Sequence, residues 1–268
     1  MTHSISEANE SATAPKMKGR QLVMMSLGSA IGTGLFVGSG KGVAAAGPAV
    51  LIAYVISGLL VIAIMYMLGE MVAAHPDSGA FSVYAERAMG PAVGFAVGWV
   101  WWIQLVVVVA AEATAAASVL YAMWPVAPTW LMSLIFLVVL TGINLLGVDR
   151  FGEFEFWFSL IKVAAVVVFL VVGVLMILGL TKAPAPGLSN VIHHGGFLPN
   201  GMSGLTSALL IVVFAFGGIE IMAVAAAETE DPARNVGRAV RTIIWRILLF
   251  YMGSVAIMVV VLPWDDPA

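Results

Sequence analysis

The chain has 268 residues, of which 61% are hydrophobic and 10% charged, and its mean hydropathy is +1.04. Soluble domains average roughly 45–50% apolar and 25% charged residues, so this composition excludes an ordinary soluble protein and predicts one helical membrane domain. A net charge of −3 leaves no basic surface for nucleic acid, and the absence of cysteine excludes disulfides and thiol chemistry.

Residues 1–20 are polar and are expected to form a disordered tail ahead of a transmembrane domain over residues 21–268. Lys16, Lys18 and Arg20 directly precede the first apolar run. Because positively charged residues stay on the cytoplasmic side, they predict a cytoplasmic N-terminus and a multi-pass protein of the cell membrane. Most of the twelve lysines and arginines fall in this tail and in the loops expected inside, which supports the same orientation.

Apolar runs long enough to cross a bilayer recur along the chain and predict an all-α polytopic protein with about seven transmembrane helices. Glycine, proline and tryptophan clusters supply the turns between them. The segment 80–89 is expected to be a short amphipathic helix, and 147–155 an inner loop. The expected spans lie at about 22–46, 50–73, 91–122, 131–146, 156–180, 205–227 and 247–262.

The first span contains a segment, Gly28–Gly42, that is too rich in glycine for a regular helix, since each interior glycine costs roughly 1 kcal/mol relative to alanine. Leu35 and Gly42 break the phosphate-loop pattern, and Val37 breaks the dinucleotide-binding pattern. Two interpretations remain: the glycines allow close helix packing, or the helix is interrupted beside a cavity that holds a solute.

A second glycine break, 214–220, lies in the sixth expected span, which crosses the membrane in the direction opposite to the first. Two interrupted spans of opposed direction are typical of transporters built from inverted repeats, whose substrate site lies near the middle of the membrane. This pairing favours the transporter interpretation over simple packing.

Several motifs resemble the bacterial amino acid permeases, a family within the amino acid, polyamine and organocation superfamily. They run from the first span to the seventh and are specific when taken together. The matching segments are Gly-Ser-Ala-Ile-Gly-Thr-Gly-Leu-Phe at 28–36, Ala-Gly-Pro at 46–48, Leu-Gly-Glu at 68–70, Pro-Asp-Ser-Gly at 76–79, Gly-Glu-Phe-Glu-Phe-Trp at 152–157, Phe-Gly-Gly-Ile-Glu at 216–220, Ala-Glu-Thr-Glu-Asp-Pro at 227–232 and Trp-Arg-Ile-Leu-Leu-Phe-Tyr at 245–251.

The resemblance implies a five-plus-five inverted-repeat fold with broken helices 1 and 6, and secondary active transport of amino acids by alternating access. The first repeat would cover about 21–180, and 204–268 would begin the second. Relatives typically have twelve spans, so the chain is expected to be a fragment of a longer permease. Proton-coupled symport is the leading hypothesis. One alternative is an amino acid exchanger. The other is a non-transporting membrane scaffold, if this chain is the whole protein. The residues of these motifs resemble those of permeases for 4-aminobutyrate and for aromatic and neutral amino acids.

Half-helix ends supply both donors and acceptors to a zwitterionic substrate. The resemblance implies that the first break gives N–H groups and the Thr33 hydroxyl to the substrate carboxylate, and that carbonyls of the second break receive its ammonium. Phe216 is the better candidate for an aromatic cover, with Phe214 next, and the alternative for both rings is packing against core or lipid. The implied residues are Ser29, Ala30, Ile31, Gly32, Thr33 and Gly34 in the first break and Phe214, Ala215, Phe216, Gly217 and Gly218 in the second.

Three ionisable residues inside the spans are functional candidates, because charge is costly in lipid. Lys162 resembles a span-five lysine that replaces a sodium ion in proton-coupled relatives, and snorkelling to the inner surface is its alternative role. Glu112 is a candidate for the substrate amine or for proton handling, against a structural hydrogen bond. Glu220 either stabilises unwound backbone or carries a proton.

Catalytic and metal chemistry is not expected. His3 and His75 are isolated, and His193 and His194 lie in an outer loop without nearby acidic partners, so a metal site is not predicted. No nucleophile stands with a base at one membrane depth, which excludes an enzyme interpretation. The expected partners are an amino acid, protons and the lipid bilayer, and no cofactor is implied.

Overall fold

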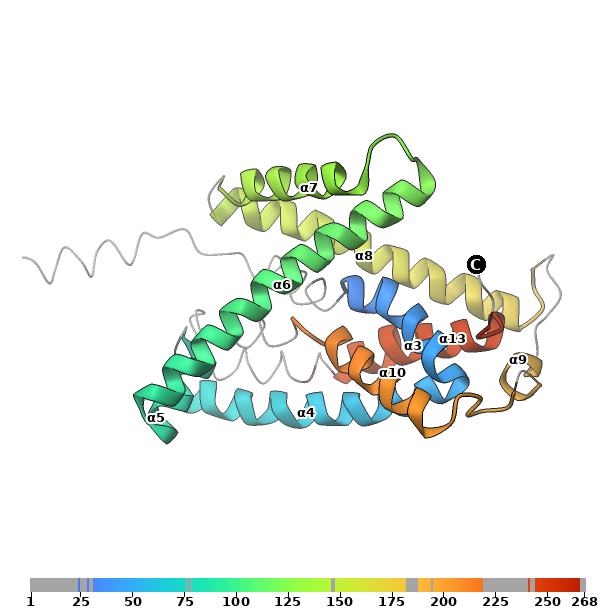
Figure 1. Cartoon of the computed structure of the whole chain (residues 1–268), viewed down its shortest axis with the longest axis horizontal. Helices are drawn as coiled ribbons and strands as arrows, with labels where there is room; N and C mark the ends of the chain where they lie inside the picture. The colour runs from blue at the N-terminus through green and yellow to red at the C-terminus, as the bar shows by residue number, and fades with distance from the viewer. Residues whose placement is uncertain are drawn as a thin grey trace, which may run out of the picture.

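The computed structural model describes residues 24, 28, 31–75, 77, 79–145, 148–181, 188–193, 195–218, 241 and 244–265. Every regular element within these ranges is helical, as the sequence predicts (Figure 1). The elements, in chain order, are η1 (Gly34–Gly38), α3 (Ser39–Ala46), η2 (Gly47–Ala49), α4 (Val50–Ala74), α5 (Ala80–Met89), α6 (Pro91–Met123), α7 (Thr129–Asn144), α8 (Val148–Ile177), α9 (Ser189–Ile192), α10 (Gly201–Ala215), η3 (Ile247–Met252) and α13 (Gly253–Val261).

Four helical stretches of the described residues have the length and apolar composition needed to cross a membrane: Gly34–Ala74, Pro91–Met123, Glu153–Ile177 and Ile244–Val261. Two shorter apolar helices, α7 and α10, overlap the fourth and sixth expected spans and begin before them. The chain is therefore an all-α polytopic membrane protein. The predicted tail, residues 1–20, lies outside the described residues.

The first of these stretches contains the turn predicted at Gly47-Pro48, and α3 and α4 run in different directions on either side of it (Figure 1). Gly47 has φ +60° and ψ −145°, a backbone conformation that favours glycine. A Cβ at this position would also lie 2.5 Å from the Pro199 ring. The turn is thus fixed by its own backbone and by the loop that covers it.

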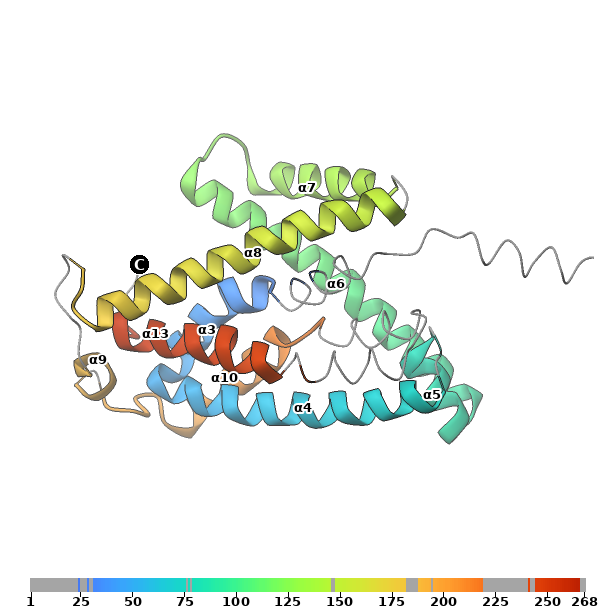
Figure 2. The same ribbon diagram turned by 180° about the vertical axis from the view of Figure 1, so that it is seen from behind.

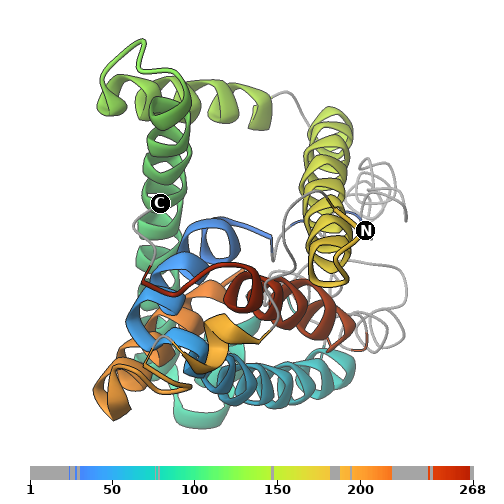
Figure 3. The ribbon, with the colours of Figure 1, turned by 90° about the vertical axis from the view of Figure 1, so that its right-hand side faces the viewer.

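A buried core joins the two expected broken spans to the second and seventh spans. Its members come from η1, α3, η2, α4, α10, η3 and α13, from Ile31 and Phe216 beside these elements, and from Val166 of α8. Figures 1 and 2 show these helices side by side, while α7 lies well away from them. In the end-on view, α6 and α8 extend from this group toward α7, which lies between their far ends (Figure 3).

The side chains of α6 and α8 are much less covered than the core. In the most apolar part of α6 only 6% of the residues are buried, and in that of α8 only 11%. The corresponding share for Ile244–Val261 is 44%. Apolar surface of this extent requires lipid or another apolar surface around it, which agrees with a membrane location.

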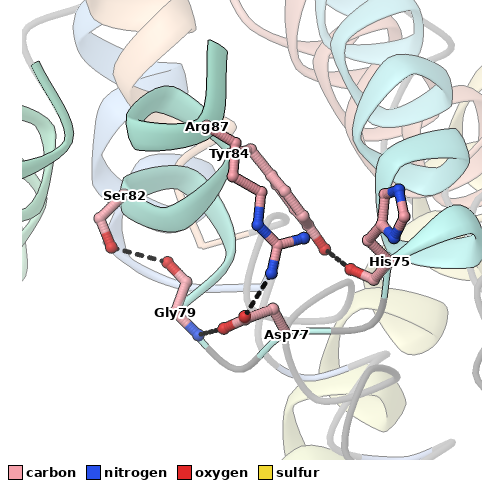
Figure 4. A network of polar contacts seen from close by, with 6 residues as sticks. All are labelled: His75, Asp77, Gly79, Ser82, Tyr84 and Arg87. Carbon is pink, nitrogen blue, oxygen red and sulfur yellow. Dashed lines mark hydrogen bonds and ion pairs between the residues drawn. The ribbon is translucent and has the colours of Figure 1, made fainter. Parts of the chain in front are cut away.

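The amphipathic helix α5 has the bounds predicted for it, and a polar network fixes the corner that precedes it (Figure 4). Asp77 accepts a hydrogen bond from the Gly79 amide at 2.9 Å and pairs with Arg87 at 3.3 Å. The Tyr84 hydroxyl donates to the His75 carbonyl at 2.6 Å. Burial first, and then the Asp77 carboxylate, raise the pKa of Tyr84, so the phenol keeps its proton and remains a donor.

One expected boundary is wrong. Residues 147–155 were expected to form a loop, yet α8 begins at Val148 and runs without interruption to Ile177. The segment has no proline, and its acidic residues near the start of the helix suit the positive end of the helix dipole. A charged helical turn can extend beyond the apolar part of a span, so the end of the hydrophobic run does not mark the end of the helix.

Candidate functional site

The first span is interrupted at the place the glycines predict. Ile31 and Gly32 form a bend rather than a helical turn, and the amides of Leu35 and Phe36 both donate to the Gly32 carbonyl, at 3.1 and 3.2 Å. From Gly34 to Gly38 the chain is wound as a π-helix before α3 begins. Single π-turns inside α-helices frequently occur at functional sites.

The second break follows α10, which ends at Ala215. The Phe216 and Gly217 amides turn back to Val213 and Phe214, at 3.3 and 3.0 Å, and close the last turn. Gly218 has φ +91°, a conformation that ends the helix and that favours glycine. The continuation of this span, residues 219–240, lies outside the described residues.

The two breaks touch each other. A Cβ placed on Gly34 would lie 2.8 Å from the carbonyl oxygen of Ala215 and 2.9 Å from its Cβ. Those distances are much shorter than the normal separation of about 3.5–4.0 Å between carbon atoms. The backbone of the first broken span therefore packs directly on the last residue of α10, and only glycine permits this approach.

Glu112 reaches the first break from the middle of α6. Its Oε1 accepts a hydrogen bond from the Thr33 amide at 3.3 Å, and a Cβ at Gly32 would overlap the same oxygen. Thr33 immediately precedes η1, so its N–H lies at the positive end of a helical segment. The carboxylate is thus held by an unwound backbone donor and by the space that Gly32 leaves.

A buried aromatic cluster covers the second break. It consists of Tyr54 from α4, Phe216, and Tyr251 from η3, which are 0%, 3% and 0% exposed. The ring centroids of Phe216 and Tyr251 are 4.7 Å apart, and those of Tyr54 and Phe216 are 5.8 Å apart in an edge-to-face arrangement. The Tyr251 hydroxyl donates to the Ala215 carbonyl at 3.1 Å, which satisfies an acceptor freed by the end of α10.

The residues predicted for the substrate site fall into three groups. Ile31, Gly34, Ala215 and Phe216 are buried where the breaks meet, and Gly32, Thr33, Gly218 and Glu112 are half-buried beside them. Gly217, within the second break, is exposed, and Phe214 is 49% exposed and is not a member of the buried core that holds Phe216. Ser29, Ala30 and Glu220 lie outside the described residues.

Lys162 is half-buried on α8, one turn after Ser159, a residue that is fully buried. Ser159 touches the first span, because a Cβ at Gly28 would overlap its side chain. Within the ranges that the structure describes, the Lys162 ammonium makes no hydrogen bond or ion pair. Through Ser159, the stretch of α8 that carries Lys162 therefore lies against the start of the first break.

Two side chains at this site were not predicted from the sequence, Tyr251 and Tyr54, and neither was the burial of Arg246. Arg246 is only 3% exposed and lies immediately before η3. An arginine within an apolar span is itself a signal of function, and Arg246 is the second residue of the Trp-Arg-Ile-Leu-Leu-Phe-Tyr motif. Tyr54 gave no comparable signal, since tyrosine in a span is usually an ordinary packing residue.

Two cavities flank the meeting point of the breaks. One of about 480 Å³ lies between α4, α6 and the end of α10, and Trp101, Gln104, Phe216 and Gly217 are among its lining residues. The other, of about 790 Å³, lies between α3 and α6 and is lined by Lys41, Thr114 and Ser118 among small apolar residues. Glu112 and the π-turn thus stand close to space that a small solute can enter.

Comparison with known proteins identifies the family of the chain. Residues 21–268 match the family model described as amino acid permease. The chain is 49% identical over 256 residues to a probable GABA permease of Pseudomonas aeruginosa and 50% identical over 251 residues to the aromatic amino acid transport protein AroP of Corynebacterium glutamicum. It is 45% identical over 252 residues to the gamma-aminobutyric acid permease of Escherichia coli.

These alignments cover 95%, 93% and 94% of the chain but 54% of each relative, so the chain spans about half the length of the curated relatives it matches. Permeases are transporters and not enzymes, as the absence of a catalytic constellation in the sequence predicts. The chain belongs to the amino acid permease family.

Proposed function

We propose that this protein transports amino acids into the cell across the cytoplasmic membrane, with its N-terminus in the cytoplasm, and that it does so as a proton symporter by alternating access. The observation that carries the proposal is the contact between the two broken spans at Gly34 and Ala215. In transporters of this kind, broken helices supply the backbone groups of the substrate site and are the elements that move.

The carboxylate and the ammonium of the substrate bind at different breaks. The N–H groups of residues 29–34 and the Thr33 hydroxyl bind the carboxylate, because the start of η1 carries positive dipole character. The ammonium lies beside residues 214–218. The carbonyls of Phe214 and Ala215 already accept hydrogen bonds, from Gly217 and Tyr251, so the acceptors left for the ligand are those further along the break.

Phe216 forms the apolar wall of the site. Its ring is buried against Tyr54 and Tyr251, and it also lines the cavity beside α4 and α6. A ring held in this way presents a rigid surface to the hydrocarbon part of an amino acid. Phe214, which is about half exposed, is assigned to the outer surface of α10.

Lys162 and Glu220 carry the coupling proton. Support for Lys162 comes from Ser159, one turn earlier on α8, which contacts the first span at Gly28. Movement of the first span over α8 therefore changes the surroundings of the ammonium and links its protonation to the state of the transporter.

Uptake of a labelled amino acid by the full-length protein in proteoliposomes tests both parts of the proposal. We expect uptake to rise when the outside is more acidic than the inside, and Lys162→Met to remove this dependence while counterflow of substrate continues. Uptake that does not depend on the pH gradient and that requires amino acid on both sides of the membrane would identify an exchanger. Absence of both uptake and counterflow would leave a non-transporting scaffold.

The curated relatives are named for 4-aminobutyrate and for aromatic amino acids, and these are the substrates we propose to test first. A thermal-shift panel on the purified full-length protein, with neutral amino acids for comparison, identifies the substrate directly. The true substrate is expected to raise the melting temperature, by an amount that grows with the logarithm of its concentration over its dissociation constant.

A further inference from the structure

The backbone donor at the first break is already occupied by the protein's own carboxylate. The Thr33 amide donates to Glu112 Oε1 at 3.3 Å, and the missing side chain of Gly32 makes room for that oxygen. The two contacts come from neighbouring residues of one unwound segment and converge on a single carboxylate oxygen from another helix. Glu112 is therefore seated in the break and does not merely lie near it.

The group that Glu112 presents has the same chemistry as one end of an amino acid. A carboxylate is a favourable ligand for an N–H at the start of a helical segment, where the dipole is positive. The Thr33 amide carries one proton and can satisfy only one strong acceptor at a time. Two carboxylates brought to this donor would also repel each other, more strongly where water is scarce.

We propose that Glu112 is an internal competitor of the substrate: its carboxylate and the carboxylate of the transported amino acid bind alternately to the Thr33 amide. The inference rests on the proposed function, since it requires a ligand with a carboxylate at the first break. Substrate entry displaces Glu112 from Thr33, and substrate release lets it return. The broken backbone is thereby satisfied in both situations, which a membrane interior requires.

This competition affects the carboxylate end of the ligand selectively. The substrate must replace an existing charge-assisted hydrogen bond. Its affinity is therefore lower than it would be for a Thr33 amide that Glu112 did not occupy. A carboxamide analogue of the same amino acid has no anionic group to compete with Glu112 and does not bear this cost. Removing the Glu112 charge is therefore expected to favour the acid over its amide.

The test measures dissociation constants for the transported amino acid and for its carboxamide on the purified full-length protein, by calorimetry. Glu112→Gln should raise the preference for the acid over the amide about tenfold, the size that one charge-assisted hydrogen bond produces. Glu112→Asp, which keeps the charge but is one methylene too short to reach Thr33, should move the preference in the same direction. Glu70→Gln, at an exposed carboxylate of α4, is the matched control and should leave it unchanged.

The alternative roles of Glu112 give different results. An equal loss of affinity for acid and amide in Glu112→Gln would mean that the carboxylate binds the ligand ammonium. Unchanged affinities for both ligands would mean a structural role only. Either result overturns the inference while the proposed function stands. If Glu112→Gln cannot be purified, Glu112→Asp decides by the same measurement. A wild-type protein that binds no amino acid would overturn the proposed function, and the inference with it.

Discussion

Replacement of Gly34 by alanine tests the contact between the two broken spans. The added Cβ would lie 2.8 Å from the carbonyl oxygen of Ala215 and 2.9 Å from its Cβ, so the two segments must separate by roughly 1 Å to restore normal carbon contacts. The atoms in the way belong to Ala215 itself and not to the end of a flexible side chain. Overpacking of this kind costs about 1–3 kcal/mol.

Gly40→Ala is the matched control, because it introduces the same methyl group two turns later in the same span. A Cβ at Gly40 meets no atom within 4 Å, and alanine in a helix interior is favoured over glycine by up to ~1 kcal/mol. The two variants should therefore differ in free energy of unfolding by about 1–4 kcal/mol.

Reversible denaturant unfolding of the full-length protein in detergent micelles measures this difference, and uptake in proteoliposomes measures its effect on transport. Gly34→Ala is expected to be the less stable variant and to lose uptake, while Gly40→Ala keeps both properties. Equal stability of the two variants would refute the packing of the first break on Ala215 and with it the basis of the proposed site.

Two further predictions concern single hydrogen-bonding groups, and thermal unfolding checks both. Tyr251→Phe removes the donor to the carbonyl at the end of α10 and should cost about 1–3 kcal/mol, whereas Tyr54→Phe should cost nothing, because the Tyr54 hydroxyl has no hydrogen-bond partner within the described residues. A loss in Tyr54→Phe alone would contradict this assignment. Asp77→Asn keeps an acceptor for the Gly79 amide but removes the exposed ion pair with Arg87, so it should cost less than about 1 kcal/mol. A larger loss would show that the ion pair holds the corner before α5.

The positions of the breaks could be predicted from the sequence because their cause is local. Glycine lowers helix stability at the residue where it occurs, and Gly32 and Gly34 fall where the first span bends and widens into a π-turn. The pair Gly217-Gly218 follows the last residue of α10 in the same way. The opposed direction of the two spans then follows from counting the helices between them.

The partners of the freed backbone groups could not be predicted, because they come from helices remote in sequence. Glu112 is 79 residues from Thr33, and Tyr251 is 36 residues from Ala215. Which helix face meets a break depends on how the helices cross. In a membrane all faces of a helix are apolar, so the periodicity of hydrophobic residues does not indicate that face. Phe216 is buried and Phe214 is about half exposed, while the preference for Phe216 as the ring over the substrate stays a prediction. Residues two apart on a helix point about 200° away from each other, so at most one of the two can face the core.

Both breaks are completed by a side chain from another helix, and this has a consequence for transport. The donor freed at Thr33 meets the carboxylate of Glu112 on α6, and the acceptor freed at Ala215 meets the hydroxyl of Tyr251 on η3. Each side chain offers the group that one end of a zwitterion would offer, an anionic acceptor at the first break and a hydrogen-bond donor at the second. A broken helix in a membrane cannot leave these groups without partners when the substrate is absent. If the protein transports amino acids as we propose, its site releases the substrate into water and therefore needs internal replacements. On that proposal, its selectivity depends on how strongly each replacement competes with the ligand.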